Sequence, residues 1–411
     1  MLATVAWRNL LRHRRRTLLT VLGMALGIVF ASLVTSISDG TYGDMIDHAA
    51  NLGTGHVSIQ HPDYQDRPRP AHAVRLPPDM TRRAATLPEV TSVVPRIEAG
   101  GVAATASAAA SVSLLGVDPA IETAETLPIF VGALDVVDPL AAVRDGVLVG
   151  ERLATRLDAR PGRKLVVTVS NRDGEVVSRL VRVRGLLRTG APSVDGGLII
   201  ISNAELQGAL GYTEDEFTRY AVLLSDHRTA PAVTAELERW LPADASALRW
   251  DEAQPELAQF IAIDGTAGQL IELLVLLMLT AGVFNTMLVS VMERTRELGV
   301  LRAIGFSGGQ IFRMVTWEGL WLGTLGVAVG LLVWWPLYAV LSERGIDMSS
   351  LVPPNSEIAG VAMSPVMTVK IRATRLLFIC GICLAATLLA GLYPARRASR
   401  LCPVDAMRGE P

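Results

Sequence analysis

The residue types that could carry chemistry are present, but few of them have the spacing of a catalytic site. The sequence contains no GxxxxGK(S/T), HExxH or GxSxG, the patterns of a phosphate-binding loop, a zinc hydrolase and a serine hydrolase. The histidines of the first long polar stretch lack the spacing that places two metal ligands on one helix face; they are His48, His56, His61 and His72. We therefore expect no catalytic residue, no metal site and no cofactor site in this chain.

Cys380 and Cys383 form a CxxC pattern, which is typical of some redox and metal sites. They lie within an apolar run without a histidine or aspartate nearby, so small residues packed inside a helix are the favoured interpretation. The third cysteine is Cys402, and residues 39–265 contain none. That polar region must be held together by a hydrophobic core rather than by disulfides.

A charged segment, ERTRELGVLRAIGFSGGQI, lies between two long apolar runs at Glu293–Ile311. Its first turns are both acidic and basic, an apolar ridge follows, and a glycine-rich turn ends it. A helix that only lay on lipid headgroups would carry mainly lysine and arginine. The mixture favours a helix within 293–316 that docks onto another protein. Its candidate contact residues are Glu293, Arg294, Arg296, Glu297, Leu298, Leu301, Arg302, Ile304 and Gly305.

Four apolar segments must position this helix, and each is long enough to cross a bilayer. They are residues 17–38, 266–292, 317–341 and 375–393. Half of all residues are hydrophobic, which is unusual for a soluble chain of this length. The predicted fold is an α-helical membrane protein with four transmembrane helices. A large extracytoplasmic α/β domain is inserted between the first and second of them.

Arginines predict the orientation, because short loops rich in basic residues stay in the cytoplasm. They are concentrated in residues 1–16, 293–316 and 394–411. We therefore expect a cytoplasmic amphipathic helix in the membrane interface at 1–16 and a cytoplasmic tail at 394–411. The domain at 39–265 and the loop at 342–374 are then outside. The first span is too long for a signal peptide and is interpreted as an uncleaved anchor.

The region outside the membrane is acidic. Residues 39–264 hold 31 acidic and 21 basic side chains, although the whole chain has a net charge of only −2. This distribution argues against nucleic-acid binding.

Alternating and helical patterns predict a mixed α/β domain, with a membrane-proximal layer made from both its ends and a β-rich insertion between them. The predicted strands are 56–60, 111–117, 164–169, 175–187, 197–202 and 220–224, and the predicted helices are 78–87, 150–157, 203–210 and 230–241.

Small residues spaced at helical intervals predict close packing of the spans. They are Gly23, Gly27, Gly319, Gly323, Gly326 and Gly330. Such faces, on only four spans, also favour association with a second copy or a related chain. Two carboxylates in the spans, Glu272 and Glu318, are interpreted as structural, the latter as a partner of Arg313.

Three segments of the sequence resemble the FtsX-like permeases, the type VII superfamily of ABC transporters that includes MacB, LolC and LolE. They are WRNLLRHRRRTLLTVLGMALGI, ERTRELGVLRAIGFSGGQIFRMVTWEGLWLGTLG and YPARRASRLCPVDAMR. One span, a large outer domain and three further spans is also the layout of that superfamily. The resemblance implies a multi-pass protein of the bacterial inner membrane with a periplasmic domain.

The resemblance also implies partners. Two permease chains, identical or paralogous, would join two copies of a cytoplasmic ATPase. Only about 16 residues precede the first span, so the ATPase, with its ATP and Mg²⁺, is expected on a separate chain. The coupling helix of the family corresponds to Glu293–Phe306, and closure of the ATPases would push on it and lever the outer domain. This is mechanotransmission, and no substrate need pass through a pore.

Extraction of a lipoprotein or lipid from the inner membrane is the favoured function, because the outer domain and its Thr54–Val57 segment look closest to LolE-type permeases. A MacB-like efflux permease with a periplasmic adaptor is the first alternative. An FtsX-like regulator of a periplasmic hydrolase is the second, disfavoured because FtsX has a much smaller outer domain. A periplasmic chaperone is a further expected partner for extraction.

Overall fold

The structure is a computed structural model that describes residues 2–12, 14–128, 133–134, 138–351, 353 and 355–400. It divides into two compact units. Unit 1 holds the described residues of 1–41, 263–346 and 366–411, and unit 2 holds those of 42–262 and 347–365. Most of the predicted tail, residues 401–411 with Cys402, lies outside the described residues.

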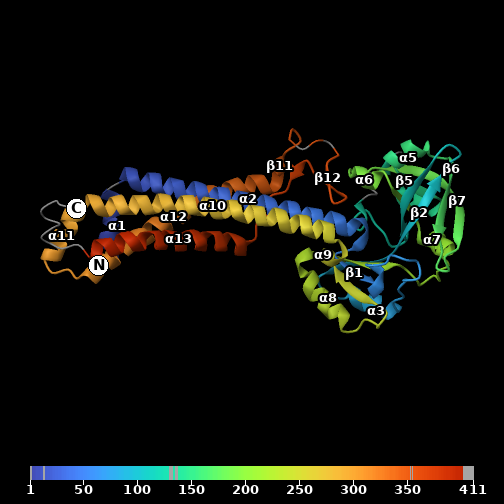
Figure 1. The fold of residues 1–411 in the computed structure, drawn as a ribbon, viewed down its shortest axis with the longest axis horizontal. Helices are drawn as coiled ribbons and strands as arrows, with labels where there is room; N and C mark the ends of the chain where they lie inside the picture. The colour runs from blue at the N-terminus through green and yellow to red at the C-terminus, as the bar shows by residue number, and fades with distance from the viewer. Residues whose placement is uncertain are drawn as a thin grey trace. The chain divides into compact units, whose positions relative to one another are not determined.

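Four long helices are apolar enough to cross a membrane (Figure 1), as predicted for an α-helical membrane protein with four transmembrane helices. They are α2 (Arg14–Ala49), α10 (Pro255–Glu293), α12 (Gly308–Arg344) and α13 (Ala373–Ser399). Each is longer than its predicted span, because hydropathy marks only the apolar part of a helix. In α2 and α10, polar residues that favour helices continue the hydrogen-bonded backbone, to totals of 36 and 39 residues.

Two shorter helices complete unit 1, α1 (Leu2–Arg12) and α11 (Thr295–Ala303). The segment predicted to hold the coupling helix, 293–316, is interrupted at the predicted glycine-rich turn. Gly305 has a φ of 109°, which favours glycine, and ends the segment after α11. Ser307 then caps α12 through a reciprocal capping box with Gln310.

Unit 2 contains a sheet of ten strands among the described residues. Their bounds are β1 (Val57–Gln60), β2 (Val90–Ala104), β3 (Ala109–Val117), β4 (Ala133–Leu134), β5 (Val147–Gly150), β6 (Lys164–Ser170), β7 (Val176–Leu187), β8 (Leu198–Ser202), β9 (Arg219–Leu224) and β10 (Ser246–Arg249). The strand order is β10-β1-β9-β2-β3-β8-β5-β7-β4, and β6 pairs with both β2 and β7.

Because β6 joins β7 back to β2, six of these strands form a closed ring, which is a small β-barrel (Figure 1). Only the β3–β8 and β5–β7 pairs are parallel. Alternate residues fill the inside: Val147 and Val149 share one core, whereas Leu148 belongs to a second core outside the ring. The β6–β7 hairpin turns at Asn171–Gly174, as predicted.

A second layer combines both ends of the domain. It consists of β1, β9, β10 and the first half of β2, covered by α3 (Pro78–Ala85) and α8 (Ala230–Glu238). Its core includes Val57, Ile59, Val222 and Val233.

Strand β2 runs through both layers, pairing with β9 over Val90–Arg96 and with β3 over Ile97–Ala104. This strand was not predicted. The strand contains Pro95, which has no backbone N–H to donate to a neighbouring strand, and the pair Gly100–Gly101. These residues are unfavourable in strands, so the sequence pattern of a strand is weak there.

The remaining elements of unit 2 are short. They are the π-helix η1 (Ala50–Thr54), the 3₁₀ helices η2 (Pro62–Tyr64) and η4 (His227–Thr229), α4 (Pro139–Arg144), α5 (Glu151–Leu157), α6 (Pro192–Asp195), α7 (Asn203–Leu210), α9 (Trp250–Ala253) and the strands β12 (Glu357–Ile358) and β13 (Val361–Ala362). Strands β11 (Ile346–Asp347) and β14 (Val366–Met367) flank the second segment of unit 2.

A buried ion pair joins β2 to the segment that follows β3, and the same arginine binds the backbone of η1. Arg96 donates to both carboxylate oxygens of Glu122, and neither side chain is exposed. The remaining guanidinium protons go to the backbone carbonyls of Asn51, Gly53 and Thr126. All five donors of Arg96 are therefore satisfied inside the domain.

A second polar cluster lies beyond the predicted first span, on the part of α2 that belongs to unit 2. Asp47 accepts hydrogen bonds from His56 at 3.0 Å and from His227 at 3.3 Å. Burial favours the protonated acid, but the bonds from His227 and His56 outweigh it and hold the pKa of Asp47 well below its usual range. The cluster therefore ties α2 to η4 and to the start of β1.

Candidate functional site

Arg294 is the centre of an ion-pair network in unit 1. It donates to Glu318 of α12 at 2.9 Å and to Glu297 of α11 at 3.1 Å. Asn9 of α1 also donates to Glu318, at 2.7 Å, and Arg12 donates to Glu297 at 3.1 Å. The predicted pairing of Glu318 with Arg313 is therefore wrong, because Arg294 and Asn9 occupy its carboxylate.

The predicted contact residues of the charged segment divide between two roles. Leu298 is buried in the core of unit 1, Leu301 packs against that core, and Arg294 is mostly buried in its ion pairs. These three residues hold α11 to the bundle instead of presenting a binding surface.

The exposed residues of α11 and the turn that follows it share one face. They are Arg296, Glu297, Val300, Ala303, Ile304 and Gly305, and Ile304 is 73% exposed. The predicted apolar ridge is therefore split, since Leu298 and Leu301 point inward and Ile304 points outward. Arg302 is half-buried, and its guanidinium lies within 3.0 Å of a Cβ placed at Gly308. Glu293 pairs with Arg16 at 2.7 Å and Glu297 with Arg12, so both acids already have partners in the chain.

The glycines of α12 pack it against the other long helices. A Cβ at Gly326 would lie 2.8 Å from Met24 of α2, and one at Gly330 would lie 3.1 Å from Ile28. Gly323 faces Leu384 and Thr387 of α13, and Gly319 faces Met287 of α10. Close approach along this stripe holds unit 1 together within a single chain.

The two glycines predicted to pack from α2 behave differently. A Cβ at Gly27 would overlap Leu279 of α10, so the two helices approach closely there. A Cβ at Gly23 would have no atom within 4 Å. Gly23 is therefore not a packing residue of this chain, and it lines a groove instead.

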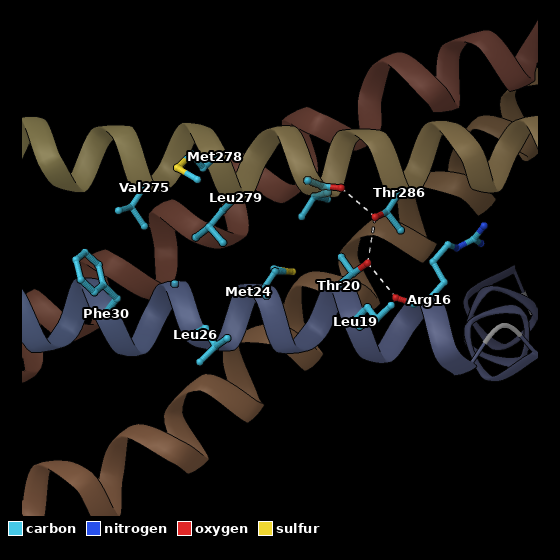
Figure 2. A pocket seen from close by; sticks show the side chains of 14 residues that line it. Arg16, Leu19, Thr20, Met24, Leu26, Phe30, Val275, Met278, Leu279 and Thr286 are labelled. Atoms are coloured by element: carbon cyan, nitrogen blue, oxygen red, sulfur yellow. Dashed lines mark hydrogen bonds between the residues drawn. The ribbon is translucent and has the colours of Figure 1, made fainter.

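The groove lies between α2 and α10 and has a volume of about 600 Å³ (Figure 2). Its walls are almost entirely apolar. At one end Thr20 donates to Thr286 across the groove at 3.1 Å, and Arg16 donates to Ser290 at 2.8 Å. The lining residues are Arg16, Leu19, Thr20, Gly23, Met24, Leu26, Gly27, Phe30, Val275, Met278, Leu279, Gly282, Val283 and Thr286.

A second cavity of about 400 Å³ shares Gly27, Val275 and Leu279 with the groove. It extends between α2, α10 and α13 and is more polar. Glu272 accepts a hydrogen bond from Thr35 there, and Arg375 lines the same cavity. The close contact of Gly27 with Leu279 lies between the two cavities, and each cavity is mainly apolar with charged residues in its lining, Arg16 in the groove and Glu272 and Arg375 in the second cavity.

Most of these groove residues were not predicted, since leucine, valine and methionine on a membrane helix are the expected lipid-facing types. Only Gly23 and Gly27 gave a signal, and Gly282, which faces the groove from α10, belongs to the same class of small residue. The groove forms only where two segments distant in sequence meet, so the pattern of either helix alone does not predict it.

Two family models match parts of this chain. Residues 17–240 match the MacB-like periplasmic core domain, and residues 270–403 match the FtsX-like permease C-terminal domain. A solved structure of the periplasmic region of MacB from Actinobacillus actinomycetemcomitans aligns with 51% of this chain and 94% of its own, at 13% identity and a TM-score of 0.33.

Two curated relatives match over nearly the whole chain. The macrolide export ATP-binding/permease protein MacB of Shewanella sp. (strain ANA-3) is 23% identical over 97% of this chain, which spans 59% of the length of that relative. The lipoprotein-releasing system transmembrane protein LolC of Neisseria meningitidis serogroup B is 24% identical over the full length of both. The chain belongs to the FtsX-like family of ABC transporter permeases that carry a MacB-like periplasmic core domain.

Proposed function

We propose that this chain is the non-catalytic permease subunit of an ABC transporter that extracts lipoproteins or lipids from the bacterial inner membrane. Two copies of a separate cytoplasmic ATPase bind ATP and Mg²⁺ and supply the energy, and this chain binds neither. A second permease chain, identical or paralogous, completes the complex. The full-length match to LolC supports this assignment.

The proposed orientation places both termini and α11 in the cytoplasm and unit 2 in the periplasm. The arginine-rich segments 1–16, 293–316 and 394–411 support it. Helices α2 and α10 then carry motion across the membrane, because each is continuous well beyond its apolar span.

The exposed face of α11 is the proposed docking surface for the ATPase. Its apolar residues Val300 and Ile304 are exposed at 41% and 73%, and Arg296 lies on the same face. Exposed apolar side chains beside a charged one are typical of a protein contact.

Ile304→Asp is expected to lower the amount of ATPase that copurifies with the permease by about tenfold or more, because a carboxylate would lose its hydration in the interface. Pull-down from solubilised membranes, with the ATPase identified by mass spectrometry, measures this. Ile304→Val should bind as the parent chain does. Equal ATPase recovery with the aspartate variant would exclude this face as the docking surface.

The groove between α2 and α10 is the observation that carries the substrate assignment. An acyl chain needs an apolar surface, and the groove of about 600 Å³ with the neighbouring cavity provides it. The charged groups in their linings, Arg16 and the Glu272–Arg375 region, suit a polar headgroup or the first residues of a lipoprotein.

Photo-crosslinking tests this assignment. A photoreactive residue at Leu26 or Met278, which line the groove, is expected to capture an acylated protein in cells. The same residue at Leu332, which is 74% exposed on α12, is the matched control. Capture of ordinary phospholipid alone at all three positions would overturn the assignment.

MacB-like efflux is the second candidate, favoured by the match of residues 17–240 to the MacB-like core domain. In that case a periplasmic adaptor, rather than a lipoprotein chaperone, should copurify with unit 2. ATPase activity that responds to such an adaptor but not to acylated protein would select efflux.

A further inference from the structure

Three potential metal ligands meet where the chain leaves β1. One ring nitrogen each of His61 and His72 and one carboxylate oxygen of Asp63 all lie within 4.8 Å of one another. The two imidazole rings are stacked, with centroids 4.9 Å apart and planes 10° apart. Neither histidine is fully exposed, and the Asp63 side chain, at 72% exposure, is free to turn.

The hydrogen bonds around His72 leave one of its nitrogens available. Its Nδ1 lies 2.8 Å from the carbonyl oxygen of Arg67, which can only accept, so Nδ1 carries the proton. The Nε2 atom then keeps its lone pair. A backbone carbonyl bound to the other ring nitrogen is the usual orienting contact of a metal-binding histidine.

The lone pair of His61 is on Nδ1, where it already accepts a hydrogen bond. The backbone N–H of Asp63 donates to His61 Nδ1 at 3.1 Å, so Nδ1 is unprotonated. The carboxylate of Asp63 is 3.9 Å from the same atom. A cation at Nδ1 would displace the exposed hydrogen bond from the Asp63 backbone N–H, which caps η2.

We propose that His61, Asp63 and His72 bind a divalent transition-metal ion of the Zn²⁺ class. Two imidazoles and one carboxylate are a donor set that such ions prefer. Metal–ligand bonds of about 2.0–2.2 Å require ligand atoms no more than about 4 Å apart. Because imidazole lone pairs lie in the ring planes, the two rings must turn out of their parallel stack and the exposed Asp63 side chain must rotate before all three groups reach one ion.

The surrounding chain is already anchored on both sides of the site. Tyr64 is buried, with its hydroxyl donating to the carbonyl of Glu98, and Tyr212 donates to the carbonyl of Pro70 at 2.6 Å. The metal would close the proline-rich excursion that runs from residue 61 to residue 72. Three protein ligands leave a fourth position for water or for a donor atom of a periplasmic partner.

The test measures Zn²⁺ binding calorimetrically to the full chain in nanodiscs, in a background with Cys380, Cys383 and Cys402 replaced by serine. We expect one ion per chain at neutral pH and weaker binding at about pH 5, since protons compete for the ligands. His72→Ala should weaken the affinity by at least about tenfold. The matched control, His48→Gln, removes an exposed histidine outside the site and should bind as the parent does.

Asp63→Asn keeps the test valid if a histidine variant misfolds, since Asp63 is exposed and its loss cannot disturb a core. It should also weaken binding. Zn²⁺ affinity that is equal in His72→Ala, Asp63→Asn and His48→Gln would overturn the proposal, as would the lack of saturable binding by the parent chain. Circular dichroism of each variant shows whether unit 2 is folded.

Discussion

Gly23→Leu is expected to abolish capture of acylated protein by the groove. A Cβ at this position meets no atom within 4 Å, so a leucine fits on α2 without strain and projects four carbon atoms into the cavity of about 600 Å³. Leucine also favours a helix more than glycine does. Copurification and photo-crosslinking through Met278 should fall by at least tenfold, while the variant inserts and binds the ATPase normally.

Two further variants make this prediction specific. Gly282→Leu enters the same groove from α10, again with no atom within 4 Å of its Cβ, and should have the same effect. Gly381→Leu adds an equal side chain to an equally open position of α13 that does not line the groove, and should capture substrate normally. Undiminished capture by Gly23→Leu, or a loss explained by failure to form the permease dimer, would exclude the groove as the substrate site.

Glu122→Ala is expected to loosen η1, the turn that follows α2. It leaves Arg96 charged and fully buried without its partner, which typically costs about 3–5 kcal/mol. Amide hydrogen exchange of residues 50–54 should accelerate about a hundredfold or more, since each 1.4 kcal/mol corresponds to a factor of ten. Transport should weaken as well. Without Glu122, the Arg96 side chain is no longer held in the position from which it donates to the carbonyls of Asn51 and Gly53.

A double variant and an exposed pair serve as controls for this prediction. Arg96→Met with Glu122→Leu removes both charges and should be less damaging than Glu122→Ala alone. Glu151→Ala breaks the exposed pair with Arg188 and should leave exchange at 50–54 unchanged. If the single and double variants have equal amide exchange rates at residues 50–54, an unpaired buried charge is not the cause of the loosening of η1.

Composition alone was sufficient to predict the four long helices, because uncharged apolar runs of that length are typical of membrane spans. The turn after α11 could also be predicted, because Gly305 and Ser307 encode it locally. The strands of the barrel were largely predictable, since alternation persists in β6 and β7 and β8 is a short apolar run. These features could be predicted because each depends on residues that are close together in the sequence.

Features that depend on distant partners could not be predicted. The sequence places Arg313 nearest to Glu318 on one helix, but the fold brings Arg294 and Asn9 to it. His61 and His72 meet only because the chain between them turns back. The groove needs residues 16–30 and 275–286 together, and neither segment alone differs from any lipid-facing helix.

The shared strand β2 has a consequence for how the protein is made. The barrel uses strands between residues 97 and 202, which can pair soon after they reach the periplasm. Strand β1 must wait for β9 and for β10, which ends at Arg249, just before α10 begins at Pro255. The outer domain is therefore completed only as the second span reaches the translocation machinery. A ribosome that stops early would leave β1 unpaired, and periplasmic proteases could recognise the truncated chain by that edge.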